Sequence, residues 1–205
     1  MAKPLRPVPP TKESYLKRFR AMSAALPEEA DLILIGDSLA ASWPSALLEG
    51  ARGGRRVLNL GLAGDRVETT AWRLGAGRTE HLRPRELVLL VGSNNLTDGD
   101  APEAIAAGIG QVVRQARWLW GEPDTVVVTV PWRGPAPGFR DGERLRLNAL
   151  LGRDLPATLG ARVIDADRAL DHSPPAYPGF LPDLVHLSPD GYRQLTRALP
   201  GARRG

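Results

Sequence analysis

The sequence predicts an α/β fold in which a parallel β-sheet is covered by helices on both faces. Short apolar runs of strand length alternate along the chain with longer amphipathic segments, an order that is typical of βαβ units. The run Leu87-Val88-Leu89-Leu90-Val91 is apolar at every position, as expected for a strand that is buried on both faces of a sheet. Together these patterns predict a three-layer α/β/α sandwich.

The elements follow one another in a regular order. The first is a helix over residues 12–26, in which Tyr15, Leu16, Phe19 and Met22 recur at helical spacing. Five strands are then predicted, at residues 32–35, 57–59, 87–91, 126–130 and 162–165. Helical segments separate them and provide the crossovers that parallel strands need.

Three helices in the second half of the chain carry clear signals. Two of them have apolar stripes that predict core-facing surfaces: Ile105, Ile109, Val112, Val113 and Ala116 in one, and Leu147, Leu150, Leu151 and Leu155 in the other. Asp100 and Glu103 are predicted to form a capping box at the start of the first. Ser188 is a good N-cap with Pro189 at the first helical position, so the last helix should run from there to about residue 199.

The domain organisation is expected to be simple. A length of 205 residues is typical of one domain. We expect a Pro-rich tail over residues 1–11, a single domain over residues 12–200, and a short basic tail over residues 201–205. No internal repeat and no linker divides the chain.

Composition excludes several classes of protein. The chain has no cysteine, which excludes disulfides, thiolate zinc sites and a cysteine nucleophile. His81, His172 and His186 form no helical His-x-x-x-His pair, so no metal site is predicted. The net charge is +4, but the basic residues are spread along the chain, so no nucleic-acid partner is expected.

The hydropathy of the sequence bears on membrane insertion and on the location of the protein in the cell. No apolar stretch approaches the roughly 20 residues of a membrane span. Residues 1–10 lack the apolar core of a signal peptide. We therefore expect a protein with no membrane span, located in the cytoplasm.

Four polar segments are predicted at one edge of the sheet, the edge where open α/β sheets bind ligands. Three of them follow strands: Gly36-Asp37-Ser38-Leu39, Asn59-Leu60-Gly61-Leu62-Ala63-Gly64-Asp65 and Gly92-Ser93-Asn94-Asn95. A serine at this edge can act as a nucleophile when a base reaches it. Exposed glycine amides and the Asn94 side chain can donate hydrogen bonds to a developing oxyanion.

The fourth segment, Asp183-Leu184-Val185-His186, precedes the last helix. Its spacing lets the aspartate reach the imidazole, which fixes the tautomer and leaves the other ring nitrogen free to accept a proton from serine. Each segment alone also fits a simpler interpretation, such as a strand-to-helix turn, an Asx turn or a surface ion pair. All four occur together and in order, which favours one common site.

This set of segments resembles the SGNH, or GDSL-type, esterase and lipase superfamily. The resemblance implies a flavodoxin-like fold with a five-stranded parallel sheet in the order 2-1-3-4-5. It implies that Ser38 is the nucleophile, that Asp183 and His186 complete a triad, and that an oxyanion hole is formed by the amides of Ser38 and Gly64 and the side chain of Asn94. No metal or organic cofactor is needed for such a reaction. The expected partner is a small-molecule acyl ester, and a homodimer is left open.

Within that superfamily the chain is most similar to the intracellular platelet-activating-factor acetylhydrolase catalytic subunits. The shared segments include residues 59–65, 72–74, 80–84, 165–167 and 183–192. Ala63 stands where glycine is more usual, which leaves Gly61 as an alternative to Gly64 for the oxyanion hole.

The resemblance also implies a pocket. Leu39, Ser93 and Val185 adjoin the catalytic positions, and residues at these places close the acyl pocket of the acetylhydrolases, so acyl groups of about two to four carbons are expected. Trp132 and His172 are further candidates for the pocket, and residues 133–138 are expected to form a loop over the site. Asn95 should point away from the site, so its replacement should have a mild effect.

The predicted function is therefore that of a serine esterase for short-chain or acetyl esters, acting through an acyl-serine intermediate. One alternative is an enzyme with another substrate, either a lysophospholipase or thioesterase for longer acyl chains or a carbohydrate O-acetylesterase. The other alternative is a binding or assembly module with a vestigial site.

Overall fold

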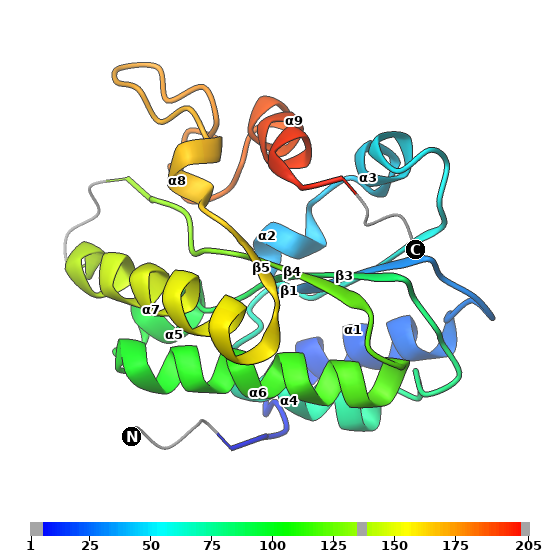
Figure 1. Cartoon of the computed structure of the whole chain (residues 1–205). Helices are drawn as coiled ribbons and strands as arrows, with labels where there is room; N and C mark the ends of the chain where they lie inside the picture. Colours follow the sequence, from blue (N-terminus) through cyan, green and yellow to red (C-terminus); the bar gives the residue numbers. More distant parts are fainter. Residues whose placement is uncertain (1–5, 135–138, 202–205) are drawn as a thin grey trace.

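Five parallel strands form one sheet in the order β2-β1-β3-β4-β5 (Figure 1). This is seen in a computed structural model that describes residues 6–134 and 139–201. The strands are β1 (Leu32–Gly36), β2 (Val57–Gly61), β3 (Glu86–Leu90), β4 (Asp124–Val128) and β5 (Arg162–Ile164). All neighbouring strands pair in parallel. The predicted strands and their order are confirmed, with ends that shift by one or two residues.

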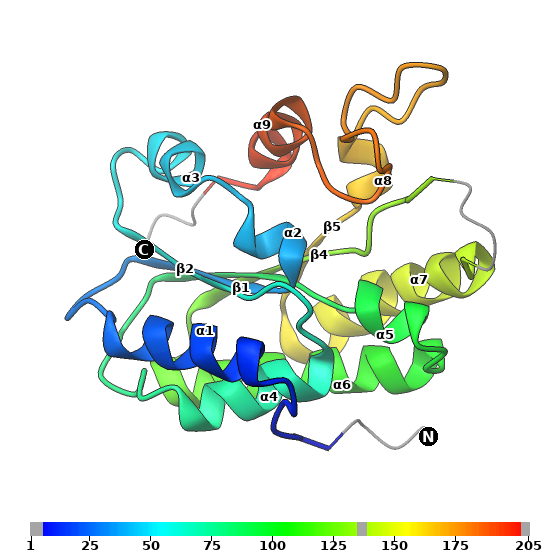
Figure 2. The ribbon, with the colours of Figure 1, turned by 180° about the vertical axis from the view of Figure 1, so that it is seen from behind.

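Helices cover both faces of this sheet, as the two opposite views show (Figures 1 and 2). One layer consists of α1 (Glu13–Ala24), α4 (Val67–Ala76), α5 (Ser93–Thr97), α6 (Pro102–Trp120) and α7 (Asp141–Leu159). The other layer consists of α2 (Ser38–Ala41), α3 (Ser45–Ala51), α8 (Ala166–Ala169) and α9 (Pro189–Ala198). The predicted three-layer α/β/α sandwich is thus confirmed.

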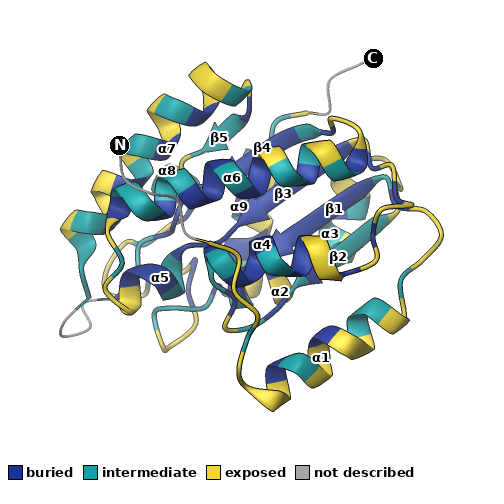
Figure 3. Cartoon of the chain, turned by 90° about the horizontal axis from the view of Figure 1, so that it is seen from below, coloured by how far each residue is buried: buried dark blue, intermediate teal, exposed yellow. Residues whose placement is uncertain are grey.

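Successive residues of the central strands face opposite cores. In β1, Ile33 and Ile35 pack in the core beneath α4, α6 and α7, whereas Leu32 and Leu34 pack in the core beneath α2, α3 and α9. Strand β3 alternates in the same way. Both faces are covered, so these strands need apolar residues at every position, and they are dark blue in Figure 3.

The predicted helix caps have different outcomes. Ser188 caps α9 as expected, because its Oγ accepts a hydrogen bond of 3.0 Å from the Gly191 amide. The predicted capping box of Asp100 and Glu103 is wrong: α6 begins after Ala101, which has no side-chain cap. The Asp100 carboxylate instead accepts hydrogen bonds from Asn95 in α5 and from Arg66, which lies 34 positions away in the sequence.

The ends of the chain and one loop are described only in part. Residues 1–5, 135–138 and 202–205 lie outside the described residues. They include the first part of the predicted N-terminal tail and most of the predicted C-terminal tail and of the loop expected over the site. Residues 6–11 run along the protein, where the Val8 amide donates to the Glu68 carbonyl at 3.2 Å. Among the helices of the described segments, none has the length and apolar character to cross a membrane.

Candidate active site

The nucleophile candidate lies at the carboxyl end of β1, in a turn that only glycine allows. Gly36 has a φ of +153°, and a Cβ at this position would lie 1.8 Å from the Leu90 carbonyl oxygen of β3. The chain then enters α2 at once, with the Asp37 carboxylate accepting a hydrogen bond of 2.9 Å from the Leu39 amide as the N-cap. Ser38 is therefore the first residue of a short helix. The Gly36 turn before it and the Asp37 cap together fix the position of that helix start.

Ser38, His186 and Asp183 form one chain of hydrogen bonds. The Nε2 atom of His186 is 3.2 Å from Ser38 Oγ, and its Nδ1 atom is 2.7 Å from Asp183 Oδ2. The carboxylate takes the proton-bearing Nδ1, which leaves Nε2 as the acceptor facing the serine hydroxyl. The structure brings together the three residues that the sequence predicted, although 148 positions separate the serine from the histidine.

Asp183 is held in its ionised form. Its Oδ1 atom accepts hydrogen bonds from the amides of Val185 and His186, at 3.0 and 2.9 Å. The hydrogen bond from the His186 ring, together with these amides, lowers the pKa of Asp183 to about 2. A charged carboxylate at this position stabilises the positive imidazolium that forms when the histidine takes up a proton.

Two side-chain contacts tie the segment that carries Ser38 to the helix that follows His186. The hydroxyl of Tyr192 donates to the Leu39 carbonyl at 3.0 Å, and the indole nitrogen of Trp43 donates to Thr196 Oγ1 at 3.0 Å. These contacts join the α2 region to α9 within the core. The distance between Ser38 and His186 is therefore set by packed elements and not by loops alone.

Gly64 and Asn94 lie at the carboxyl ends of β2 and β3. Gly64 has a φ of +85° with open space around it, a backbone conformation that favours glycine. The Gly61 amide already donates to Asn59 Oδ1 at 2.8 Å, whereas the amides of Ser38 and Gly64 have no acceptor among the residues that the structure describes. Of the two glycines, Gly64 is the one with a donor to offer.

The Asn94 side chain is oriented by the same loop. Its Nδ2 atom donates to the Asp65 carbonyl at 2.7 Å. An amide nitrogen carries two hydrogens, so one remains for a ligand. Asn94 is half-buried at the start of α5, next to the loop that carries Gly64.

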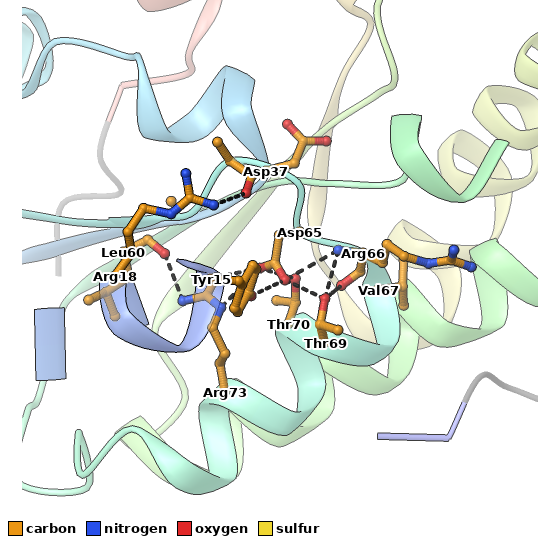
Figure 4. A network of polar contacts seen from close by, with 12 residues as sticks. Tyr15, Arg18, Asp37, Leu60, Asp65, Arg66, Val67, Thr69, Thr70 and Arg73 are labelled. Carbon is orange, nitrogen blue, oxygen red and sulfur yellow. Dashed lines mark hydrogen bonds and ion pairs between the residues drawn. The ribbon is translucent and has the colours of Figure 1, made fainter. Parts of the chain in front are cut away.

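A buried network around Asp65 supports this loop, and sequence reasoning assigned it no role (Figure 4). The Asp65 carboxylate accepts hydrogen bonds from Tyr15, Thr69 and Thr70 and forms an ion pair with Arg73, in which the two side chains are 0% and 2% exposed. Truncating one partner of a buried ion pair leaves an uncompensated charge. Asp65 and Arg73 stood in segments shared with the acetylhydrolases, and that likeness was the only available signal.

Asn95 has a structural role that its place in the sequence did not indicate, and the mild effect on catalysis expected from its replacement stays a prediction. Asn95 does point away from Ser38, but its side chain is fully buried. Its Oδ1 atom accepts from the Val67 amide at 2.9 Å, and its Nδ2 atom donates to Glu68 and Asp100. The side chain therefore joins α5 to the start of α4, a role that depends on partners about 30 positions away in the sequence.

Asp37 is a buried acid directly beside Ser38 in the sequence. It is 1% exposed, and its Oδ2 atom has no hydrogen-bond partner among the described residues. Burial raises the pKa of Asp37 to about 7, although the Leu39 amide opposes that rise. The sequence motif placed this residue correctly but could not show that it is removed from water.

The predicted pocket residues are found in different surroundings. Leu39 is 4% exposed and packs in the core, because successive side chains of a helix point in different directions; it offers no open wall to a ligand. Ser93 and Val185 are half-buried beside Asn94 and His186. Trp132 stacks on His172 with ring centroids 5.5 Å apart, so these two lie together in an aromatic cluster.

No group of three metal-ligating side chains comes together in the described parts of the chain. The donor set at the site consists of one serine, one histidine and one aspartate.

Comparison with known proteins gives a consistent result. A model of the "GDSL-like Lipase/Acylhydrolase family" matches residues 34–194. The human "Platelet-activating factor acetylhydrolase IB subunit alpha1" is 30% identical over 174 residues, which cover 84% of this chain and 74% of the relative. The human alpha2 subunit is 26% identical over the same length, covering 84% of this chain and 75% of the relative.

Solved structures share the fold at lower identity. A GDSL-like lipase from Bacteroides thetaiotaomicron has a TM-score of 0.68 and 14% identity, covering 89% of this chain and 93% of that one. Est24, a carbohydrate acetylesterase from Sinorhizobium meliloti, has a TM-score of 0.68 and 19% identity, covering 82% and 94%.

Proposed function

The chain belongs to the GDSL-like lipase/acylhydrolase family and is a hydrolase, and from that premise we propose that it cleaves short-chain carboxylic esters through an acyl-serine intermediate on Ser38. One observation carries the proposal: the hydrogen-bonded chain from Asp183 through His186 to Ser38, with distances of 2.7 and 3.2 Å. A nucleophile, a base and a group that orients the base are the parts that nucleophilic ester cleavage requires.

The first half-reaction transfers the acyl group to the enzyme. Ser38 Oγ attacks the ester carbonyl carbon while Nε2 of His186 removes the hydroxyl proton. When the tetrahedral intermediate collapses, the bond to the leaving oxygen breaks and His186 donates the same proton to that oxygen. The alcohol departs, and the acyl group remains on Ser38.

The negative charge of the tetrahedral intermediate needs donors at the sheet edge. We assign this role to the Ser38 amide, the Gly64 amide and the second hydrogen of Asn94 Nδ2. The two free amides and the fixed Asn94 side chain support the assignment. Donors that are already oriented stabilise the oxyanion without a reorganisation cost.

The second half-reaction releases the acid. His186 removes a proton from water as the water oxygen attacks the acyl carbon. The bond between that carbon and Ser38 Oγ then breaks, and His186 returns the proton to Oγ as the acid leaves. Asp183 keeps its negative charge throughout, which the low pKa of about 2 supports. The carboxylate therefore orients and stabilises the imidazole and does not carry the proton.

Two observations favour a short acyl group. The two human relatives, which cover 84% of this chain, are named as acetylhydrolases, and one structure with the same fold is titled a carbohydrate acetylesterase.

Hydrolysis of p-nitrophenyl acetate, butyrate and octanoate by wild type and Ser38→Ala tests the proposal. Loss of the nucleophile should lower kcat by several orders of magnitude, roughly 10⁴-fold or more. The fold should be unaffected, because Ser38 lies at a sheet edge outside the cores, and the far-UV circular dichroism of both proteins checks this. If Ser38→Ala hydrolysed esters as fast as wild type, the proposed mechanism would be wrong.

A further inference from the structure

A polar groove opens beside the candidate oxyanion donors. It has a volume of about 560 Å³, and its lining includes Gly64 and Asn94 on one side and the first turns of α1, with Lys12 and Arg18, on the other. Neither Asp183 nor His186 lines it. The groove therefore extends from the oxyanion donors in a direction away from the catalytic base.

A buried contact fixes the position of α1 along this groove. The Tyr15 hydroxyl donates to the Asp65 carboxylate at 2.6 Å, and Tyr15 is 5% exposed. Residues three positions apart lie on the same side of a helix, so this anchor places Arg18 over the same loop. Arg18 donates to the Ala63 carbonyl at 3.1 Å, one residue before Gly64 (Figure 4).

The cations of the groove differ in how they are paired. Arg66 is neutralised, because it forms ion pairs with Glu68, Asp98 and Asp100. Lys12 and Arg18, by contrast, have no carboxylate partner among residues 6–134 and 139–201. The wall formed by α1 thus carries two unpaired positive charges, whereas the single acid in the lining, Asp98, is held by Arg66.

We propose that this groove binds an anionic group of the ester substrate, and that Lys12 and Arg18 select esters that carry a carboxylate, sulfonate or phosphate. The inference rests on the proposed function, since it places the scissile carbonyl at Gly64 and Asn94. The part of the substrate that extends past these donors, here called its arm, would lie in the groove and contact the guanidinium of Arg18. The arm belongs either to the acyl part or to the alcohol part of the ester, and the test separates the two.

Two matched pairs of esters provide the test. The release of acid from each ester is measured by titration at constant pH. Monoethyl succinate is compared with ethyl butyrate for a charge on the acyl part, and 3-acetoxypropane-1-sulfonate with butyl acetate for a charge on the alcohol part. The quantity measured is the ratio of kcat/KM for the anionic ester to that for its neutral partner. Intrinsic reactivity cancels when this ratio is compared between variants.

Arg18→Ala and Lys12→Ala should each lower the ratio for one of the two pairs, through KM. A hydrogen bond to a charged group in an open groove predicts a fall of about tenfold for Arg18→Ala, and a smaller fall for Lys12→Ala. Arg18→Lys should restore part of the ratio. High salt should lower the wild-type ratio, because screening weakens exposed charges.

The controls lie on the same helix. Arg20 forms an ion pair with Glu13 and Lys17 is exposed, and neither lines the groove; Arg20→Ala and Lys17→Ala should leave both ratios unchanged. If Arg18→Ala lowered turnover of all four esters by one common factor, Arg18 would only brace the Ala63 carbonyl and the inference would be wrong. Failure of wild type to hydrolyse any ester would instead overturn the proposed function itself.

Discussion

Replacing Asp37 by asparagine should stabilise the protein more at high pH than at low pH. Asp37 is 1% exposed, and burial raises its pKa from 3.8 to about 7. The Leu39 amide opposes this rise, the nearby Asp65 carboxylate adds to it, and His186 opposes it. Asparagine keeps the side-chain oxygen that caps α2 but cannot ionise.

The magnitude follows from the two pKa values of Asp37. In the unfolded chain the carboxyl ionises near its ordinary pKa of 3.8, whereas in the folded protein it does so near 7. The folded state therefore binds more protons between these values, and stability falls as the pH rises through that window. The full penalty above about pH 7 is about 4 kcal/mol, and it fades as the pH falls below 3.8, where the carboxyl becomes protonated in both states.

Urea unfolding of wild type and Asp37→Asn at pH 4, 6 and 8 measures this penalty. The buried amide of the asparagine adds a cost of about 1–3 kcal/mol, but this cost does not vary with pH. The expected result is that the difference in unfolding free energy between variant and wild type shifts by about 4 kcal/mol in favour of the variant. A difference that stays constant from pH 4 to pH 8 would refute the claim that Asp37 is buried as an acid.

Four further predictions concern the site. Asn94→Ala should lower kcat by about two to three orders of magnitude with little change in KM, whereas Asn95→Ala should lower the free energy of unfolding by about 2–4 kcal/mol. Steady-state kinetics and thermal unfolding of both variants check this, and a reversed pattern would show that their roles are exchanged. The rate should fall towards acid pH, because a protonated imidazole cannot accept the serine proton; Asp37→Asn should keep this acid limb, and a flat pH profile would exclude a histidine base. Asp183→Asn should impair kcat less than His186→Ala in the same assay, and equal losses would mean that Asp183 does more than orient the ring. Among p-nitrophenyl esters, acetate or butyrate should give the highest kcat/KM, and a maximum at octanoate or longer would contradict a short acyl pocket.

The sheet could be predicted because its signals are local. Strand β3 is apolar at each position from Leu87 to Leu90, and this pattern alone indicates burial on both faces. The cap of α9 was also local, since Ser188 and Pro189 are adjacent. The start of α6 was mispredicted because the Asp100 carboxylate is engaged by Asn95 of the preceding helix and by Arg66, which lies 34 positions away in the sequence.

The same distinction explains the site. Asp183 and His186 lie three positions apart, so their contact could be predicted from spacing, and the positions of Ser38 and Asn94 follow from strand ends. The burial of Asn95, the network around Asp65 and the core position of Leu39 could not be predicted, because they depend on which elements pack together. The residues next to a side chain in the sequence do not indicate which side chains of other elements will pack against it.

Stoichiometric labelling with a p-nitrophenyl alkylphosphonate tests the central claim most directly. Such a reagent phosphonylates only a serine that a neighbouring base activates, and it needs no knowledge of the natural substrate. We predict one adduct per chain by intact mass, located on Ser38 by peptide mapping, absent in Ser38→Ala and strongly slowed in His186→Ala. An unlabelled wild type, or an adduct that persists in Ser38→Ala, would contradict the account.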